Sequence, residues 1–87
     1  MIEVGYCAMK LYDYHGRYNL SGIRIREKRE ALHMSQEGLA RALQLEGMEV
    51  TQKTISRIEK GLRVVPDFEL KYFSAALHEP VEWFLEE

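Results

Sequence analysis

From residue 21 onward, apolar residues recur every three or four positions, which is the spacing of one face of an α-helix. The pattern predicts five short helices: about 22–33, 35–45 and 51–61, a fourth opened by Pro66-Asp67, and a fifth opened by Pro80. Five short helices with brief links imply a compact all-α cluster. The predicted inward faces carry Ile25 and Leu32, then Leu39, Ala40 and Leu43, then Ile55 and Ile58, then Leu70, Phe73, Ala76 and Leu77, and finally Val81, Phe84 and Leu85.

Residues at the predicted helix ends agree with these boundaries. Ser21, Ser35 and Thr51 stand where a side-chain oxygen can cap the N-terminus of a helix. Gly61 stands where a helix commonly stops, and Pro80 suits a first helical position.

Residues 1–20 follow a different pattern. Ile2, Val4 and Tyr6 alternate with other residues, and a turn is expected at His15-Gly16. We therefore expect a short extended N-terminal arm at 1–20, followed by one helical domain at 21–87. The arm can pack on its own domain or on a second copy, and the pattern favours neither.

The predicted third helix separates apolar from polar side chains. At about 100° per residue, Ile55 and Ile58 face the same way, toward the core. The opposite side carries Gln52, Lys53, Ser56 and Arg57. Glutamine can read adenine, Arg or Lys can read guanine, and Ser can contact base or phosphate, so this face has the chemistry to read a major groove. The alternative is an ordinary amphipathic helix whose polar face is only solvated.

A cation interrupts the apolar stripe of the first helix, because Ile25, Arg29 and Leu32 stand at i, i+4 and i+7. A cation at such a position needs a buried partner or a route to water. Glu59 borders the apolar face of the third helix and is the best-placed partner, so we predict an Arg29–Glu59 ion pair. The alternative is that Arg29 extends its guanidinium to solvent.

Several spaced motifs resemble the Cro/repressor-type (XRE) helix-turn-helix family. They are MSQEGLA at 34–40, TQKTISRIEKG at 51–61, and the pair Ala75-Ala76-Leu77 and 81–85 (VEWFL) near the end. The resemblance covers about residues 22–86. It implies a five-helix, λ-repressor-like fold whose third helix enters the major groove. It also implies a sequence-specific DNA-binding transcriptional regulator, expected to be a dimeric repressor that reads with helix 51–60.

The resemblance assigns roles position by position. Base-contacting positions of the family coincide with Gln52, Lys53 and Arg57. Gln36 falls where a family glutamine binds phosphate and braces the recognition helix, and Arg29 and Glu59 coincide with the family's buried ion pair. Further phosphate neighbours are expected among Arg24, Arg26, Lys28, Lys60 and Arg63, about half of them being only surface charge.

One segment departs from the family pattern. The link from Ala40 to Ile55 is about five residues longer than the family's tight turn. Either the second helix is extended or the turn is a loop, and the choice affects the orientation of the third helix. Glu46 and Glu49 would repel phosphate, so the loop is expected to point away from DNA or to flank it.

The net charge of −2 is unevenly distributed along the chain. Residues 1–21 carry no net charge, residues 22–65 carry +3, and residues 66–87 carry −5. A polyanion responds to the local field more than to the total, so the middle segment is compatible with DNA. The alternative is a solvated surface of mixed charge.

Other features exclude several classes of protein. The single Cys7 excludes an internal disulfide and fits a reducing cytosol, so a cytoplasmic protein is expected. No apolar run is long enough for a membrane helix, and no secretion signal is present. His15, His33 and His78 lack the spacing of a metal site or proton relay, and the isolated glycines form no phosphate loop. We therefore predict no metal, no cofactor and no catalysis.

The expected partner is double-stranded DNA, bound by a homodimer because one helix reads only a few base pairs. Candidate dimer surfaces are Trp83-Phe84-Leu85 and the arm at 1–20. The alternative function is a protein-interaction or antitoxin-like adaptor module, which the acidic tail and the N-terminal aromatic residues motivate.

Overall fold

The computed structural model of the chain describes residues 13–86. The strand-like alternation expected at 2–6 lies outside these residues. Within them, the chain forms four α-helices and one 3-10 helix: α2 (Ser21–Ala31), α3 (Gln36–Leu45), α4 (Gln52–Glu59), α5 (Asp67–Leu77) and η1 (Val81–Leu85). The predicted all-α class and the order of five helices are confirmed, with the fifth wound as a 3-10 helix.

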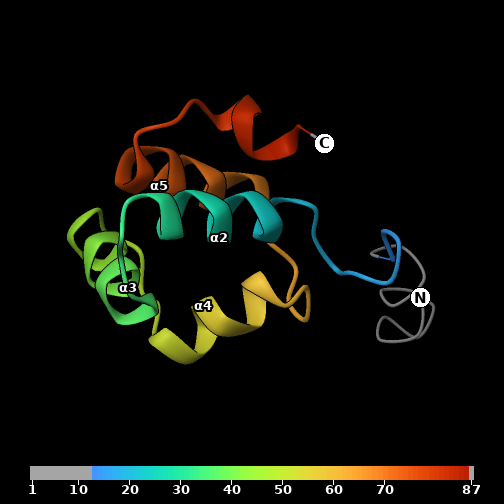
Figure 1. Cartoon of the computed structure of the whole chain (residues 1–87), viewed down its shortest axis with the longest axis horizontal. Helices are drawn as coiled ribbons and strands as arrows, with labels where there is room; N and C mark the ends of the chain where they lie inside the picture. The colour runs from blue at the N-terminus through green and yellow to red at the C-terminus, as the bar shows by residue number, and fades with distance from the viewer. Residues whose placement is uncertain (1–12, 87) are drawn as a thin grey trace, which may run out of the picture.

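The helices pack around α2, which contacts α4 on one side and α5 and η1 on the other. Figure 1 shows α4 along one edge of the molecule and η1 at the opposite edge, with α3 closing one end. α3 contacts both α4 and α5, so it joins the two sides of the bundle. This arrangement leaves the outer side of α4 uncovered by the other helices.

One hydrophobic core fills the space between the helices. Its fully buried side chains are Ile25, Leu39, Leu43, Ile55, Ile58, Phe73, Leu77 and Phe84. Each helix contributes at least one of them, because its apolar residues recur on one face. The inward faces predicted for α3 and α4 are therefore confirmed.

Two residues predicted to face the core do not. Leu32 is 40% exposed, because α2 ends at Ala31 and Leu32 already belongs to the turn that follows. Leu85, at the end of η1, is 50% exposed, because the three-residue period of a 3-10 helix turns it away from the side occupied by Phe84.

Two of the three predicted N-caps are confirmed. The hydroxyl of Ser35 accepts a hydrogen bond from the Gly38 amide at 2.9 Å, and Thr51 caps α4 through the Thr54 amide at 3.3 Å. The prediction for Ser21 is wrong, since this residue is buried inside the first turn of α2. Asn19 caps that turn instead, its side-chain oxygen accepting from the Gly22 amide at 2.8 Å.

The long link between α3 and α4 is an ordered loop rather than an extension of α3. It holds Met48 and Val50 in the core, only 5% and 6% exposed. The side chain of Gln44 donates to the Val50 carbonyl at 2.7 Å, which ties the loop to the end of α3. Of the acidic residues in this link, Glu46 and Glu49 are both exposed.

The turn predicted at His15-Gly16 is confirmed. Tyr14 and Arg17 exchange two backbone hydrogen bonds, of 2.7 and 3.0 Å, across these two residues. Both turn residues have positive φ, 52° for His15 and 83° for Gly16, as tight hairpin turns require. Among the described residues, no helix has the length and apolar character needed to cross a membrane.

Candidate nucleic-acid interface

The outer face of α4 carries the polar residues that the sequence placed there. Gln52, Lys53 and Arg57 are exposed and Ser56 is half-buried. The side chain of Lys53 makes no hydrogen bond or ion pair with any residue between 13 and 86, and the side chain of Arg57 makes only one, of 3.3 Å, to the Leu62 carbonyl. Both cationic tips are therefore available to a ligand on this side.

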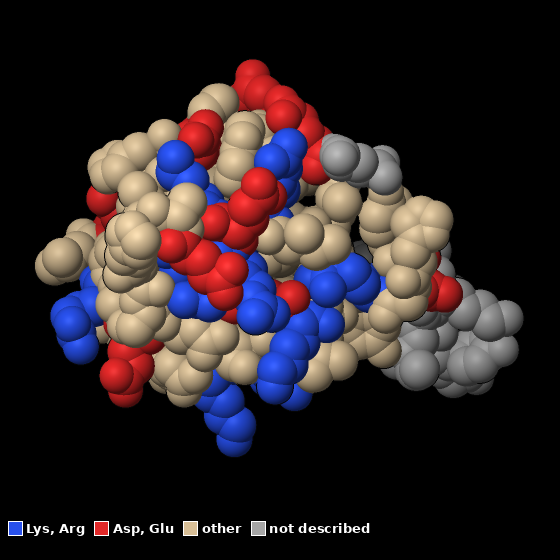
Figure 2. Space-filling model, viewed as in Figure 1, with Lys and Arg blue, Asp and Glu red and all other residues tan. Residues whose placement is uncertain are grey.

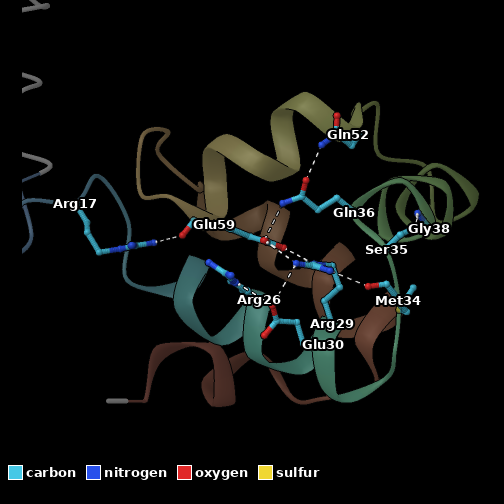
Figure 3. A network of polar contacts seen from close by, with 10 residues as sticks. All are labelled: Arg17, Arg26, Arg29, Glu30, Met34, Ser35, Gln36, Gly38, Gln52 and Glu59. Atoms are coloured by element: carbon cyan, nitrogen blue, oxygen red, sulfur yellow. Dashed lines mark hydrogen bonds and ion pairs between the residues drawn. The ribbon is translucent and has the colours of Figure 1, made fainter.

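A chain of polar contacts runs from the inner side of α4 to its exposed N-terminus (Figure 3). Arg29 donates two hydrogen bonds to the Glu59 carboxylate, at 2.7 and 3.1 Å. Gln36 donates to the same carboxylate at 3.0 Å, and Gln52 donates to the side-chain oxygen of Gln36 at 2.6 Å. The side chain of Gln52 is therefore held in place from within the molecule.

The inner end of this series of polar contacts is almost completely shielded from solvent. The side chains of Arg29 and Glu59 are 11% and 3% exposed. Arg29 also donates to the Met34 carbonyl at 2.8 Å, so its guanidinium is satisfied on several sides. The hydrogen bonds to Glu59 raise the pKa of Arg29 above its ordinary value, although burial opposes the shift. The pairing expected from the helical spacing is thus the geometry that the structure has.

The predicted phosphate contacts fall into two groups. Arg24, Lys28 and Arg63 already bind carboxylates of this chain. Lys28 lies 2.8 Å from Glu79, and Arg63 makes two hydrogen bonds to Glu69, of 2.7 and 3.0 Å, that raise the pKa of Arg63.

Arg24 is held most extensively of this first group. Its guanidinium lies 3.2 Å from Glu86 and 3.4 Å from Glu27, and 4.5 Å above the Trp83 ring. In the second group, Arg26 pairs with Glu30 at 3.1 Å while both side chains stay more than half exposed. Lys60 is exposed and has no ion-pair partner within the described range.

One cation near α4 was not among the predicted site residues. Arg41 is exposed on α3 and makes no ion pair within residues 13–86. It lines a shallow groove between α3 and α4 together with Glu37, Thr51 and Gln52. Its position four residues after Glu37 on a predicted helix was the signal that could have placed it on this face.

The C-terminal end of α4 is held by residues that precede α2. Arg17 donates to the Glu59 carbonyl at 2.9 Å, and the side chain of Asn19 donates to the Ile58 carbonyl at 3.0 Å. The Tyr18 amide donates to the Gly61 carbonyl at 2.8 Å. The sequence offered no periodic signal for these contacts, since they join irregular backbone to a helix end.

Charge is segregated between the two edges of the molecule. Figure 2 shows Lys and Arg side chains projecting along the edge formed by α4, whereas Asp and Glu are prominent at the opposite edge, over the C-terminal segment, where they lie beside a few Lys and Arg. The exposed cations near α4 that lack an ion pair within the described residues are Arg41, Lys53, Arg57 and Lys60. A phosphate backbone approaching α4 meets a field of favourable sign.

The remaining candidate groups are accounted for structurally. His15, His33 and His78 are exposed, with φ of 52°, 58° and 62°, and residues 13–86 contain no cluster of His, Cys, Asp or Glu that could hold a metal ion.

The prediction that Phe84 forms part of a dimer surface is wrong, because Phe84 is fully buried. Its neighbour Trp83 is partly buried against the core.

Comparison with known proteins agrees with this geometry. A family model described as Helix-turn-helix matches residues 25–84, which spans all but the start of α2 through most of η1. No curated protein and no solved structure matches the chain significantly. The family is one of DNA-binding regulatory domains. The chain therefore belongs to the Cro/repressor-type helix-turn-helix family.

Proposed function

We propose that this chain is a sequence-specific transcriptional repressor that acts in the cytoplasm as a homodimer and reads the major groove with α4. The observation that carries the proposal is the outer face of α4. It offers a braced amide and two cationic tips, with no carboxylate among the base-reading positions 52, 53, 56 and 57. These groups match the hydrogen-bonding edges of adenine and guanine.

The roles of the side chains follow from their positions. Lys53 and Arg57 contact guanine or neighbouring acceptors, Gln52 contacts adenine, and the half-buried Ser56 approaches base or backbone. Phosphate is contacted by the backbone amide of Gln36 at the N-terminus of α3, where the helix dipole also favours an anion, while the Gln36 side chain braces Gln52. Lys60, Arg26 and Arg41 extend the phosphate surface. Arg24, Lys28 and Arg63 serve mainly in ion pairs, because their charges are already matched by carboxylates.

Dimerisation is part of the proposal, because a single eight-residue helix reads too few base pairs to select one site in a genome. Two copies bound to half-sites one helical turn apart would double the set of contacts. The described residues leave several large apolar side chains exposed on other faces, among them Phe68 at 60% and Leu85 at 50%. An operator with two-fold symmetry is the expected consequence.

The proposal is tested by selecting bound DNA from a random duplex pool and then titrating the recovered site. Lys53→Ala and Arg57→Ala should each weaken binding to that site about 5- to 100-fold and relax the preference at one base position. Lys71→Ala is the matched control. It removes an equally exposed cation from α5 and should leave base preference unchanged.

The outcomes separate the proposed function from its alternative. Recovery of a palindromic site, with binding that weakens steeply as salt rises, supports a dimeric DNA reader. Equal affinity of wild type and both α4 variants for the selected site would contradict the roles given to Lys53 and Arg57. Failure to enrich any sequence would favour the protein-interaction or antitoxin-like module, for which the exposed Phe68 offers a contact surface.

A further inference from the structure

The helix proposed to read DNA needs help to keep its shape. α4 has eight residues, only about two turns, and isolated helices of this length are unstable in water. The last carbonyl groups of any helix lack partners within it. In α4 the Ser56, Arg57 and Ile58 carbonyls accept from the amides of Lys60, Leu62 and Gly61, whereas the Glu59 carbonyl has no backbone donor among residues 13–86 outside the helix. Ile58 and Glu59 are both buried, so bulk water contributes little there.

Residues 14–19, called here the N-terminal clamp, supply a donor to the Glu59 carbonyl and further donors to the Ile58 carbonyl. Arg17 donates to the Glu59 carbonyl at 2.9 Å and lies 3.5 Å from the Ile58 carbonyl. Asn19 donates to the Ile58 carbonyl at 3.0 Å and to the Arg63 carbonyl at 2.6 Å. A cation at this end of a helix also interacts favourably with the helix dipole.

The clamp and the end of α4 pack closely against each other. Arg17 is itself oriented by the Asn19 carbonyl, at 3.1 Å from Nε, and by the hairpin that joins it to Tyr14. A Cβ atom added at Gly22 would lie 2.2 Å from the Ile58 carbonyl, and one at Gly61 would lie 2.8 Å from the Arg17 guanidinium carbon. Only glycine leaves room for these approaches, so the clamp and the end of α4 are matched in shape.

Glu59 joins the clamp to the reading face. Its carbonyl is bound by Arg17, while its carboxylate is bound by Arg29 and Gln36, and Gln36 in turn holds Gln52. Figure 3 shows Arg17 and Arg29 approaching Glu59 from different sides. A shift of Glu59 would therefore be felt at the N-terminus of α4, two turns away.

We propose that the N-terminal clamp, through Arg17, is a positioning device that holds α4 in its reading orientation. The clamp lies outside the family match at 25–84. The proposal rests on the proposed function. Arg17 is not among the base-reading positions proposed for α4. It acts through Glu59, which makes it a positioning residue.

The first test needs no DNA. Hydrogen exchange is measured at the Lys60, Gly61 and Leu62 amides, which donate to the Ser56, Ile58 and Arg57 carbonyls at the end of α4. In Arg17→Ala these amides should exchange about tenfold faster than in wild type, while amides of α5 keep their protection. Unchanged exchange at all three amides would overturn the proposal.

The second test separates positioning from simple stabilisation, and it uses the DNA site selected by the wild type. At a temperature where Arg17→Ala is fully folded, its affinity for that site should fall about tenfold, with a much smaller change for random duplex. Arg17→Lys should recover part of the loss, since its ammonium reaches the Glu59 carbonyl but lacks the guanidinium fork. Lys71→Ala controls for the loss of one cation.

Each outcome has a distinct meaning. An equal loss for selected and random DNA in Arg17→Ala would reduce Arg17 to a charge contact and overturn the proposal. If Arg17→Ala does not fold, Arg17→Lys decides by the same ratio of affinities. If the wild type selects no sequence, the proposed function has failed. If the wild type selects a site and Arg17→Ala binds that site with the same affinity, only the clamp proposal has failed.

Discussion

At the scale of single residues, Glu59 lies on the inner side of α4 and is bound through both its side chain and its backbone. Arg29 and Gln36 donate to its carboxylate, and Arg17 donates to its carbonyl. A buried carboxylate is unfavourable unless it is paired and hydrogen-bonded, and here all requirements are met by three segments of the chain. The residue thus connects α2, α3 and the N-terminal clamp to α4.

Glu59→Gln should destabilise the protein by about 3 kcal/mol, because it leaves Arg29 buried without a matching charge. For a chain of this size the melting temperature should fall by about 10–20 °C. Thermal unfolding followed by circular dichroism measures the change. Glu27→Gln, the same substitution at a carboxylate that is 59% exposed, should alter stability by no more than about 0.5 kcal/mol. Equal melting temperatures for wild type and Glu59→Gln would show that the ion pair does not stabilise the fold.

At the scale of elements, the loop between α3 and α4 determines where α4 begins. Met48 and Val50 enter the core, and Gln44 holds the Val50 carbonyl at 2.7 Å. Thr51, the next residue after this anchored part of the loop, caps α4. Of the residues in this link, Met48 and Val50 are therefore packed in the same core as the helices that they join.

Met48→Ala should cost about 3 kcal/mol in the free energy of unfolding, because it leaves a cavity beneath the loop. Leu45→Ala is the natural comparison. It removes an apolar side chain three residues earlier, but Leu45 is 87% exposed, so the expected change is below about 0.5 kcal/mol. Urea denaturation of both variants gives the two values. Similar losses in both would mean that the loop is not anchored through Met48.

The helices were predictable from the sequence because their signals are local. Periodic apolar residues and the hydroxyls of Ser35 and Thr51 are enough to place α3 and α4 within a residue or two. The Arg29–Glu59 pairing also followed, since a cation on an apolar stripe demands an acid on a facing stripe. The polar outer face of α4 could be predicted from the helical period of its residues alone.

What the sequence did not predict depends on contacts between distant segments. Ser21 and Asn19 both have side chains that can cap a helix. Because Ser21 is buried in the folded protein, Asn19 is the residue that caps the first turn of α2. The pairing of Lys28 with Glu79 spans 51 positions and has no helical period. The role of Arg17 depends likewise on carbonyls 41 and 42 residues away.

At the scale of the whole molecule, the separation of charge exceeds what the net charge of −2 suggests. Carboxylates neutralise most cations on α2 and in the segment after α4, whereas the cations on the outer side of α4 have no carboxylate partner among residues 13–86. A duplex is therefore attracted to one edge and repelled by the other. The orientation of approach is set before any base is contacted.

The salt dependence of DNA affinity should reveal which cations meet phosphate. Lys60→Ala should reduce the slope of log affinity against log salt by about 0.9, the release of one counterion. Arg63→Ala should leave the slope nearly unchanged and lower stability instead, because Glu69 already matches its charge. Binding titrations at several salt concentrations measure the slopes. The opposite order of slope changes for Lys60→Ala and Arg63→Ala would mean that Arg63 exchanges its partner for phosphate.

The hydrogen bonds that link Glu59 to Gln52 have a fixed polarity. A carboxylate only accepts, so Gln36 must turn its NH2 group inward and its oxygen outward. That oxygen requires the NH2 group of Gln52, which keeps one N–H and its own oxygen free. These are the donor and acceptor that adenine complements. A negative charge inside the protein thereby dictates the orientation of an amide at the surface, two side chains away.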